Sequence, residues 1–274
     1  MNLHLGKESN YNSQYDKTLL ESIPRQIARE IIGIKNVQEL FRGYDIWNCY
    51  EFSWLNLKGK PEVRIIKFQV PCQSEFTVES KSVKLYLNSF HNSKFNNEQQ
   101  ILELLINDFC EYTKSNVIVE IFSLESFVDN KLTLFNGICL DKYDIETDIY
   151  DVDSNLLKLS QKNILVEEEL HSNLLKSNCL VTNQPDWASI YIKYIGLKID
   201  HQSLLKYIIS FRNHNEFHEQ CVEHIFNDIM QICAPNELLV YAKYTRRGGI
   251  DINPYRTNMP LSNIDIDKSR DIRQ

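Results

Sequence analysis

The sequence lacks the features that would place this protein in a membrane or on long nucleic acid. No apolar run approaches the roughly eighteen residues that a membrane-spanning helix requires, and no charged segment followed by an apolar one opens the chain. Thirty basic residues stand against 37 acidic residues, and no Lys/Arg block extends beyond Arg246-Arg247. A surface suited to a phosphate backbone is therefore missing. These absences predict a cytoplasmic protein that does not bind nucleic acid directly.

The cysteines are not arranged as a disulfide framework. Seven of them, an odd number in 274 residues, are spread from Cys49 to Cys233, and no CxxC pair occurs. Cys221 and His224 stand at i and i+3, but structural zinc almost always takes four ligands. A buried thiol beside a histidine is the stronger interpretation of that pair.

The chain does contain an internal repeat. Residues 53–62, SWLNLKGKPE, align without a gap with residues 177–186, SNCLVTNQPD, and this alignment matches Leu55 with Cys179. An apolar, β-branched segment follows each copy, as is typical of a strand. Each copy therefore predicts a loop that leads into a strand hairpin.

The repeat continues into a pair of helices in each half. Residues 96–114 and 217–233 carry apolar side chains at helical spacing, and Asn107-Asp108 falls where Asn227-Asp228 falls. Five further identities align at an offset of 121: Ser82, Tyr86, Ser89, Phe90 and Asn92 with Ser203, Tyr207, Ser210, Phe211 and Asn213.

This pattern predicts an α+β fold of two similar units. Each unit is expected to run strand, strand, helix, helix, strand, strand (ββααββ), with an antiparallel sheet packed on its helices. We predict that residues 1–140 form the N-terminal unit and that residues 141–274 form an Asp-rich linker and the C-terminal unit.

A candidate nucleophile and proton donor share one short loop of the second copy. Residues 177–187 place a thiol at Cys179 and a carboxyl at Asp186, and Pro185 closes the loop. A single cysteine is more often a small buried hydrophobe than a nucleophile. The thiol is present in the second copy alone, which favours chemistry over packing.

The two halves also differ in their polar motifs. The first half has Glu79-Ser80-Lys81, whereas the second half has His218-Glu219 where the first has Asn96-Asn97 or Glu98. Such a division predicts one composite site built from both units. An ionised Glu219 could accept two parallel hydrogen bonds from a guanine-like base, and His218 could relay protons. The alternative role for Glu219 is a charge that stabilises the helix start.

A cationic segment follows Tyr244. The sequence RRGGIDINPYRT provides guanidinium groups at Arg246, Arg247 and Arg256, while Gly248 and Gly249 allow close approach of a ligand to the backbone. Such a cluster suits phosphate. A basic hairpin turn is the alternative interpretation.

These motifs together resemble the bimodular NADPH-dependent 7-cyano-7-deazaguanine reductases, nitrile reductases of the tunnelling-fold superfamily that serve queuosine biosynthesis. The resemblance covers nearly the whole chain. It departs at Leu180, where the family usually has proline after the cysteine. The motifs are the LxxIPR entry at Leu20 to Arg25, YEFSWLNLKGKP, VESKSVKLYLNSF, SNCLVTNQPDW, FHE and YTRRGGIDINPYR.

The resemblance implies a role for each matched residue. Cys179 would be the nucleophile and Asp186 the proton donor, with NADPH as the hydride source. Val78, Glu79, Ser80, His218 and Glu219 would bind the deazaguanine, and Ser80, Lys81, Arg247 and Gly248 would contact NADPH. It also implies a homodimer of tandem tunnelling-fold units and no bound metal.

The chemistry of a nitrile agrees with this pair of groups. Addition of the Cys179 thiol and protonation of nitrogen by Asp186 would give a covalent thioimide that accepts hydride. Burial beside the thiol is expected to raise the pKa of Asp186. Three alternatives stay open: a thiol hydrolase or nitrilase, a relative of the zinc cyclohydrolases, and a purine-binding module without catalysis.

Overall fold

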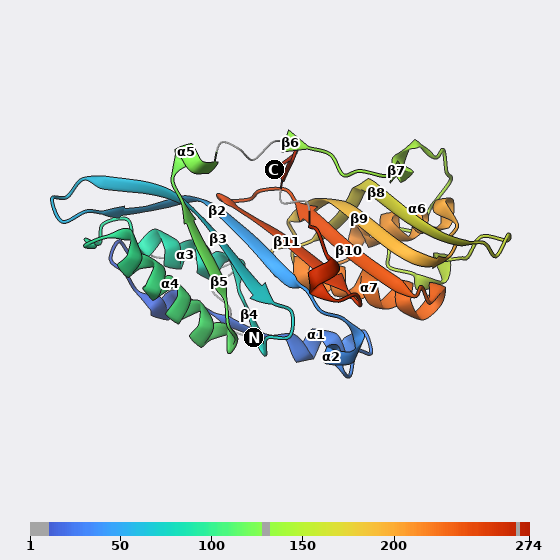
Figure 1. Ribbon diagram of the computed structural model, residues 1–274, viewed down its shortest axis with the longest axis horizontal. Helices are drawn as coiled ribbons and strands as arrows, with labels where there is room; N and C mark the ends of the chain where they lie inside the picture. The colour runs from blue at the N-terminus through green and yellow to red at the C-terminus, as the bar shows by residue number, and fades with distance from the viewer. Residues whose placement is uncertain (1–10, 128–131, 267–268) are drawn as a thin grey trace. The chain divides into compact units, whose positions relative to one another are not determined.

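The chain forms two compact units that interleave along the sequence. The computed structural model describes residues 11–127, 132–266 and 269–274 (Figure 1). Within the described residues, the first unit contains residues up to 27, residues 44–127 and residues 246–252. The second unit contains residues 28–43, 132–245 and the described residues from 253 onward. The division at residue 140 follows the sequence repeat and stays a prediction.

The first unit is an antiparallel sheet with two helices on one of its faces (Figure 1). The sheet has the strand order β5-β3-β2, and a separate pair joins β1 to β4. The helices α3 and α4 lie side by side on the sheet in both ribbon views. The elements are η1 (Lys17–Leu19), β1 (Ser22–Pro24), α1 (Arg25–Ile31, shared with the second unit), β2 (Tyr44–Leu55), β3 (Pro61–Pro71), β4 (Phe76–Val78), α3 (Ser80–Ser89), α4 (Glu98–Thr113), β5 (Ile118–Phe122) and α5 (Leu124–Phe127).

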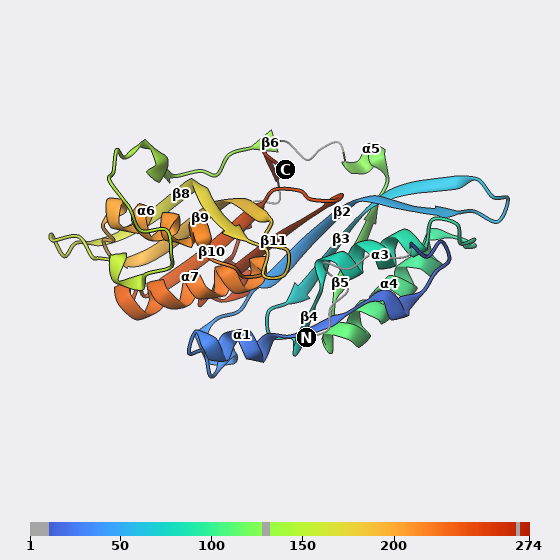
Figure 2. The same ribbon diagram turned by 180° about the vertical axis from the view of Figure 1, so that it is seen from behind.

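The second unit repeats this plan with longer strands. Its strands β8, β9 and β10 are antiparallel neighbours, β11 pairs with β10, and α6 and α7 cover one face (Figure 2). The elements are α2 (Val37–Leu40), β6 (Leu132–Thr133), β7 (Ile138–Cys139), η2 (Leu140–Lys142), η3 (Ser154–Leu156), β8 (Leu165–Asn178), β9 (Pro185–Leu197), α6 (His201–Ser210), η4 (Phe211–Asn213), α7 (His218–Cys233), β10 (Glu237–Tyr244), β11 (Ile250–Thr257), η5 (Leu261–Asn263) and β12 (Arg270–Asp271).

The predicted α+β fold is confirmed. From β8 to β11, the second unit follows the predicted order of strand, strand, helix, helix, strand, strand in full. In the first unit β5 follows the helices, and residues 250–252 of β11 also belong to that unit.

The long helices form where the apolar spacing predicts them. Ile101, Leu105 and Phe109 of α4 are fully buried against the sheet, and burial of each such side chain contributes about 1.5–3 kcal/mol. The Asn97 side chain caps the start of α4, and the left-handed residue Lys114 ends it. The equivalent helix α7 ends in the same way.

Strand pairing corrects the predicted alignment of the two hairpin loops. Leu55 pairs with Pro61 in the first hairpin, and Asn178 pairs with Pro185 in the second. The first loop therefore has residues 56–60 and the second has residues 179–184, one residue more. The match of Leu55 with Cys179 is wrong by one position, because residue identity alone cannot show where a loop gains a residue. Cys179 takes the place of Asn56.

All seven cysteines lie among the described residues, and none of them forms a disulfide. Most are buried, and burial raises the pKa of the Cys49 thiol far above its ordinary value. No helix in the described part of the chain is both long and apolar enough to cross a membrane.

Candidate active site

The nucleophile candidate lies at the tip of the β8–β9 hairpin. Cys179 directly follows β8 and is only 4% exposed. Its backbone N–H donates to the carbonyl of Gln184 at 2.8 Å, and its carbonyl accepts the N–H of Asn183 at 3.0 Å. Asn183 has φ +57°, a left-handed conformation that asparagine tolerates better than most residues. The loop is therefore a tight turn with Cys179 at its first position.

The proton-donor candidate is paired with a histidine. Asp186 lies on β9 opposite Ser177 and is 6% exposed. His218, at the start of α7, places Nε2 3.3 Å from the Asp186 Oδ2. The imidazole stacks on the ring of Tyr244, with the ring centroids 3.8 Å apart and the planes at 10°. This stacking fixes the orientation in which His218 meets Asp186.

Glu219 follows His218 in the first turn of α7 and is 4% exposed. The dipole of the helix favours a negative charge at this position. The hairpin and the first turn of α7 thus bring together four predicted residues within the second unit: Cys179, Asp186, His218 and Glu219.

Three buried polar atoms beside this group lack a hydrogen-bond partner among the described residues. They are the Ser177 Oγ, the His218 Nδ1 and the Tyr244 hydroxyl. The Ser177 and Tyr244 hydroxyls lie near each other and near the sulfur of Cys221, a weak hydrogen-bonding group. Burial, together with Cys221 and the charge of Asp186, raises the pKa of Tyr244. Buried polar atoms are normally satisfied, so these atoms are suited to a polar ligand or to water.

Cys221 is a second thiol near the same group, but its environment makes it inert. It is fully buried in α7, and that burial raises the pKa of its thiol far above the ordinary value. A thiol that stays protonated near neutral pH is a poor nucleophile. Cys179, on the hairpin tip, is the better candidate.

The Glu-Ser-Lys motif of the first unit begins α3. Val78 ends β4, and Glu79 is fully buried as the N-cap of the helix. The Glu79 carboxylate accepts the N–H of Lys81 at 2.8 Å and the N–H of Ser82 at 2.7 Å. Ser80 and Lys81 are partly exposed on the first turn. The carboxylate of Glu79 thus already occupies the N–H groups that a helix start offers to an anion.

A cationic turn lies in the same unit. Arg247 and Ile250 bridge the turn through their backbones, and Gly248 has φ +60°. A Cβ at Gly248 would meet the Lys84 Cε at 3.2 Å, so the Lys84 side chain runs past this glycine. The Arg246 guanidinium lies 4.6 Å from the centroid of the Tyr50 ring. The turn therefore gathers several cationic groups, which suits the phosphates of a dinucleotide. The Glu51 carboxylate also lies in this turn, against Gly249.

Lys84 was not among the residues predicted from the sequence. It follows Ser80 by four residues and Lys81 by three on the same helix, and this spacing could have indicated that the three side chains share one face.

Arg256 is not part of this cationic turn, which corrects the sequence interpretation. It is fully buried in the second unit, where it donates to the Glu223 carboxylate at 2.8 Å. Arg29 donates to the same carboxylate at 2.7 Å. A buried guanidinium paired in this way serves the fold, because removal of one partner would leave a buried charge uncompensated.

The predicted site residues thus fall into two groups, one in each unit. The composite site that would join them stays a prediction. The first unit holds Val78, Glu79, Ser80, Lys81, Arg247 and Gly248, and the second holds Cys179, Asp186, His218 and Glu219.

A charged cluster behind the hairpin loop was not expected from the sequence. Glu216 contacts His214 at 3.1 Å and His224 at 3.4 Å, and one ligand atom from each residue lies within 4.8 Å of the others. These three side chains could offer ligands to a divalent metal. The Glu216 carboxylate lies against both imidazoles. The segment HNEFHE contains two of the three residues and could have indicated this cluster from the sequence.

The charges of this cluster shift its pKa values. Burial alone would raise the pKa of Glu216, but hydrogen bonds to His214 and His224 hold it below the ordinary value. Burial alone would lower the pKa of His224, but Glu216 and the charge of Asp228 raise it. Both shifts stabilise the charged forms.

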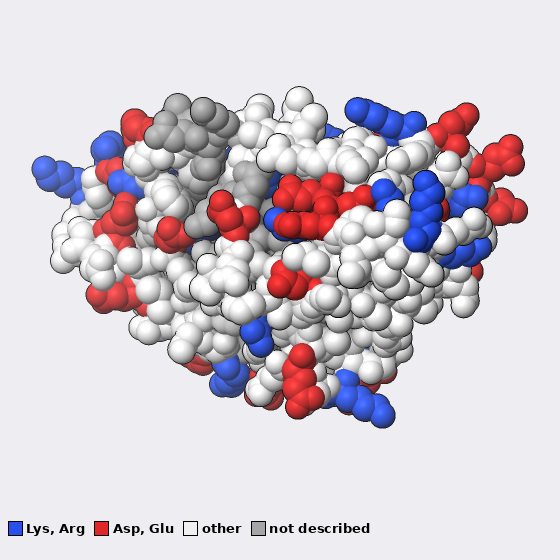
Figure 3. All heavy atoms as spheres, turned by 45° about the vertical axis from the view of Figure 1, so that its right-hand side comes forward, with Lys and Arg blue, Asp and Glu red and all other residues white. Residues whose placement is uncertain are grey.

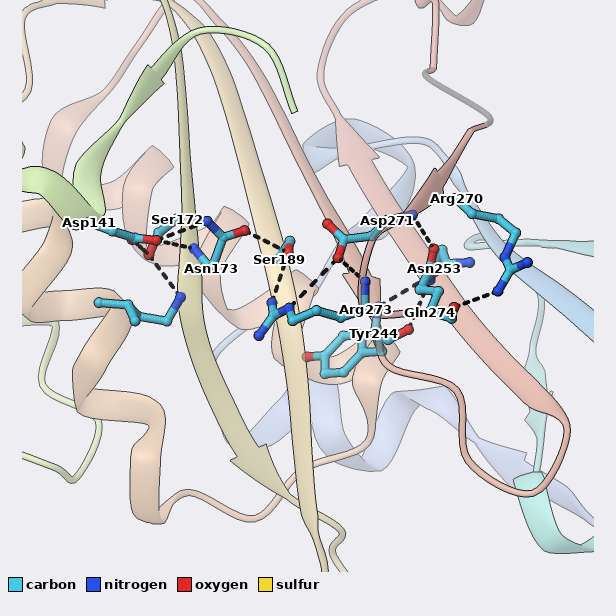
Figure 4. Close-up of polar contacts among 11 residues, drawn as sticks. Asp141, Ser172, Asn173, Ser189, Tyr244, Asn253, Arg270, Asp271, Arg273 and Gln274 are labelled. Atoms are coloured by element: carbon cyan, nitrogen blue, oxygen red, sulfur yellow. Dashed lines mark hydrogen bonds and ion pairs between the residues drawn. The ribbon is translucent and has the colours of Figure 1, made fainter. Parts of the chain in front are cut away.

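A polar network anchors the strand that carries Tyr244 (Figure 4). Gln274 donates to the Tyr244 carbonyl at 2.9 Å and to the Asn253 side chain at 2.7 Å. Arg273 donates to the Ser189 Oγ at 2.8 Å. The segment from Arg270 onward therefore holds the backbone of the residue on which His218 stacks.

A further cavity lies elsewhere in the second unit, and none of the predicted residues lines it. It has a volume of about 880 Å³, and its lining includes Glu167, Glu169, Glu237 and Asp265. Figure 3 shows acidic side chains gathered on the face that it views. An acidic cavity suits neither NADPH nor an anionic substrate.

Comparisons with known proteins agree with the motifs. A family model described as "Nitrile reductase, 7-cyano-7-deazaguanine-reductase N-term" matches residues 11–121, and one described as "QueF-like protein" matches residues 185–261. A protein of Cupriavidus metallidurans named NADPH-dependent 7-cyano-7-deazaguanine reductase is 54% identical over 93% of this chain and 92% of its own length. A protein of Ralstonia nicotianae with the same name is 53% identical over the same shares.

Proposed function

Because this chain belongs to the family of NADPH-dependent 7-cyano-7-deazaguanine reductases, we propose that it reduces the nitrile of 7-cyano-7-deazaguanine to the aminomethyl group of 7-aminomethyl-7-deazaguanine. The reaction consumes two NADPH and two protons. The observation that carries this proposal is the placement of Cys179 on a hairpin whose next strand bears Asp186, with the His218 Nε2 3.3 Å from the Asp186 carboxyl group. We further propose that the enzyme acts in the cytoplasm as a homodimer, in the pathway to queuosine in tRNA.

The first step activates the nitrile. The Cys179 sulfur adds to the nitrile carbon, and Asp186 delivers a proton to the nitrile nitrogen, so that a covalent thioimide forms and nothing is expelled. At 3.3 Å, His218 Nε2 can supply a proton to Asp186 afterwards. The low exposure of both Cys179 and Asp186 keeps water from the thioimide.

Bound NADPH supplies hydride to the activated carbon. The carbon–sulfur bond then breaks, and Cys179 recovers its proton while the imine stays in the pocket. A second hydride and a second proton complete the amine. The role of the protein between the two reductions is to retain the imine, which water would hydrolyse.

The substrate-binding residues recognise the deazaguanine ring. Glu219 accepts hydrogen bonds from the two adjacent N–H donors of the ring edge, and His218 meets the substrate through its unsatisfied Nδ1. We also propose that Val78, Glu79 and Ser80 bind the deazaguanine. Ser80 and Lys81, together with Arg247 and Gly248, hold NADPH through its phosphates.

Formation of the thioimide separates this function from its alternatives. Mixing the protein with 7-cyano-7-deazaguanine and no cofactor should give an adduct on Cys179 whose mass gain equals the whole nitrile substrate. Added NADPH should discharge the adduct as the amine. Intact-protein mass spectrometry measures both steps. Cys179→Ala should form no adduct, whereas Cys139→Ala, which alters a half-buried thiol of the same unit, should react normally.

The other outcomes have distinct meanings. Release of ammonia without NADPH would identify a nitrilase, which resolves the same thioimide with water. Tight binding with no adduct would leave a deazapurine-binding module.

A further inference from the structure

The two hairpin loops are held closed in different ways. In the first hairpin, the Asn56 side chain accepts the N–H of Lys58 at 3.0 Å and the N–H of Lys60 at 3.1 Å. That loop therefore closes on its own amide. In the second hairpin, Cys179 stands where Asn56 stands, and a thiol is too weak an acceptor to close a loop in this way. The second loop keeps two backbone hydrogen bonds at Cys179, so a side-chain hold on it has to come from outside the loop.

Asn215 provides that hold. Its Nδ2 donates to the Asn183 Oδ1 at 3.0 Å and, in a longer contact of 3.4 Å, to the carbonyl of Cys179. Its Oδ1 accepts from the Asn178 Nδ2 at 3.3 Å. One amide thus touches the residue before the nucleophile, the nucleophile itself and the left-handed residue of the turn.

The backbone around Asn215 is fixed to the same strand end. The Asn178 N–H donates to the His214 carbonyl at 2.8 Å, and the Glu216 N–H donates to the Asn178 carbonyl at 3.1 Å. His214 and His224 contact the Glu216 carboxylate at 3.1 and 3.4 Å, and Phe211 packs edge-on against both imidazoles. Asn215 therefore projects from a rigid base.

The first unit has the same two backbone hydrogen bonds, from Leu55 to Ser93 and from Phe95 to Leu55, but a different side chain between them. Its equivalent bridge joins Leu55 to Lys94, and Lys94 is exposed. The amide at residue 215 belongs specifically to the copy that carries the thiol.

We propose that Asn215 is a positioning residue that holds the Cys179 loop in the conformation that attacks the nitrile. This inference rests on the proposed function. Small errors in the placement of a nucleophile are costly, because the reacting atoms must approach within about 3–3.5 Å in a defined direction. Loss of the amide should therefore slow adduct formation without weakening substrate binding.

Two variants and a matched control test this. Asn215→Ala removes the amide, and Asn215→Asp keeps its shape but loses both donations. We expect adduct formation on Cys179 to be about tenfold to a hundredfold slower in both, with the dissociation constant of the nitrile substrate unchanged. Asn213→Asp, which alters an exposed asparagine with no described side-chain hydrogen bond, should match the native protein. Adduct formation at the native rate in both Asn215 variants would overturn the proposal.

A second measurement does not depend on the proposed function. Hydrogen exchange of the amides in residues 179–184 should be faster in both Asn215 variants than in the native protein or in Asn213→Asp. If the native protein forms no adduct, the proposed function fails and exchange alone decides. Faster exchange then supports the hold of Asn215 on the loop, and native exchange rates overturn it.

Discussion

The two halves of the chain keep the same tyrosine–aspartate pair but complete it differently. Tyr86 donates to the Asp108 Oδ2 at 2.6 Å, and Tyr207 donates to the Asp228 Oδ2 at 2.7 Å. In the first half, Asp108 also accepts from the hydroxyl of Tyr15 at 2.7 Å. In the second half, Asp228 instead lies 3.6 Å from the Nε2 of His224.

This difference connects the tyrosine–aspartate contact to the candidate active site in the second half. A tyrosine–aspartate pair joins the two helices of each unit. His224 extends the second pair to Glu216, and the backbone of Glu216 holds the strand end that precedes Cys179. The same packing motif therefore supports the nucleophile loop in one half and only the core in the other.

The largest expected effect concerns the carboxyl after the hairpin proline. Asp186 is buried and paired to His218, whereas Glu62, its counterpart after Pro61, is bound to Lys60 near the surface. Asp186→Asn should slow adduct formation about a hundredfold to ten-thousandfold, because it removes the proton donor and keeps the nucleophile. Rapid mixing followed by mass spectrometry measures the rate. Glu62→Gln should leave it unchanged, and equal losses would show that the comparison of the two halves is wrong.

Glu219 should show the next largest effect. Both long helices have 16 residues and end in a left-handed residue, so His218 corresponds to Glu98 and Glu219 to Gln99. Glu98 is the carboxylate in the first turn of the equivalent helix. Glu219→Gln should weaken binding of the nitrile substrate by about 1.5–3 kcal/mol, since a charged acceptor facing two donors becomes a partly mismatched amide. Calorimetric titration measures this, with Glu98→Gln as the control.

Binding of NADPH should hardly change in Glu219→Gln. An equal loss of affinity for both ligands would mean that Glu219 supports the fold instead.

Much of this architecture could be predicted from the sequence because the repeat is long. Apolar spacing located α4 and α7, and the aligned Tyr86 and Tyr207 proved to make the same contact to an aspartate. Cys179 and Asp186 were predicted from a loop whose hairpin the structure confirms. Their catalytic roles stay predictions.

What the sequence could not show depends on pairing between distant residues. The extra residue in the second loop is visible only in the strand register, which ends with Asn178 opposite Pro185. Arg256 has the same side chain as Arg246, but only the fold shows that Glu223 binds it in the core. Asn215 is polar in a polar segment, and its importance depends on contacts with residues 32 to 37 positions away.

The smallest effect concerns stability and pH. The pKa of His224 is raised in the folded chain by Glu216 and Asp228, against the effect of burial. A raised histidine pKa stabilises the fold fully below the unfolded pKa of about 6.5, and this stabilisation is lost as pH rises through the folded pKa. His224→Gln should therefore lower the free energy of unfolding by about 1.5 kcal/mol at pH 6 and by less at pH 9.

Tyr15→Phe is the matched change in the first half. Burial, together with the hydrogen bond to Asp108, raises the pKa of Tyr15, so its hydroxyl stays protonated between pH 6 and pH 9. Its loss should lower the free energy of unfolding by about 1 kcal/mol at both pH values. Urea denaturation at pH 6 and pH 9 measures both variants. Only a partner that titrates between pH 6 and pH 9 can make the loss of stability depend on pH in this range. The comparison of the two aspartates would therefore be wrong if the loss in Tyr15→Phe changed with pH, or if the loss in His224→Gln did not.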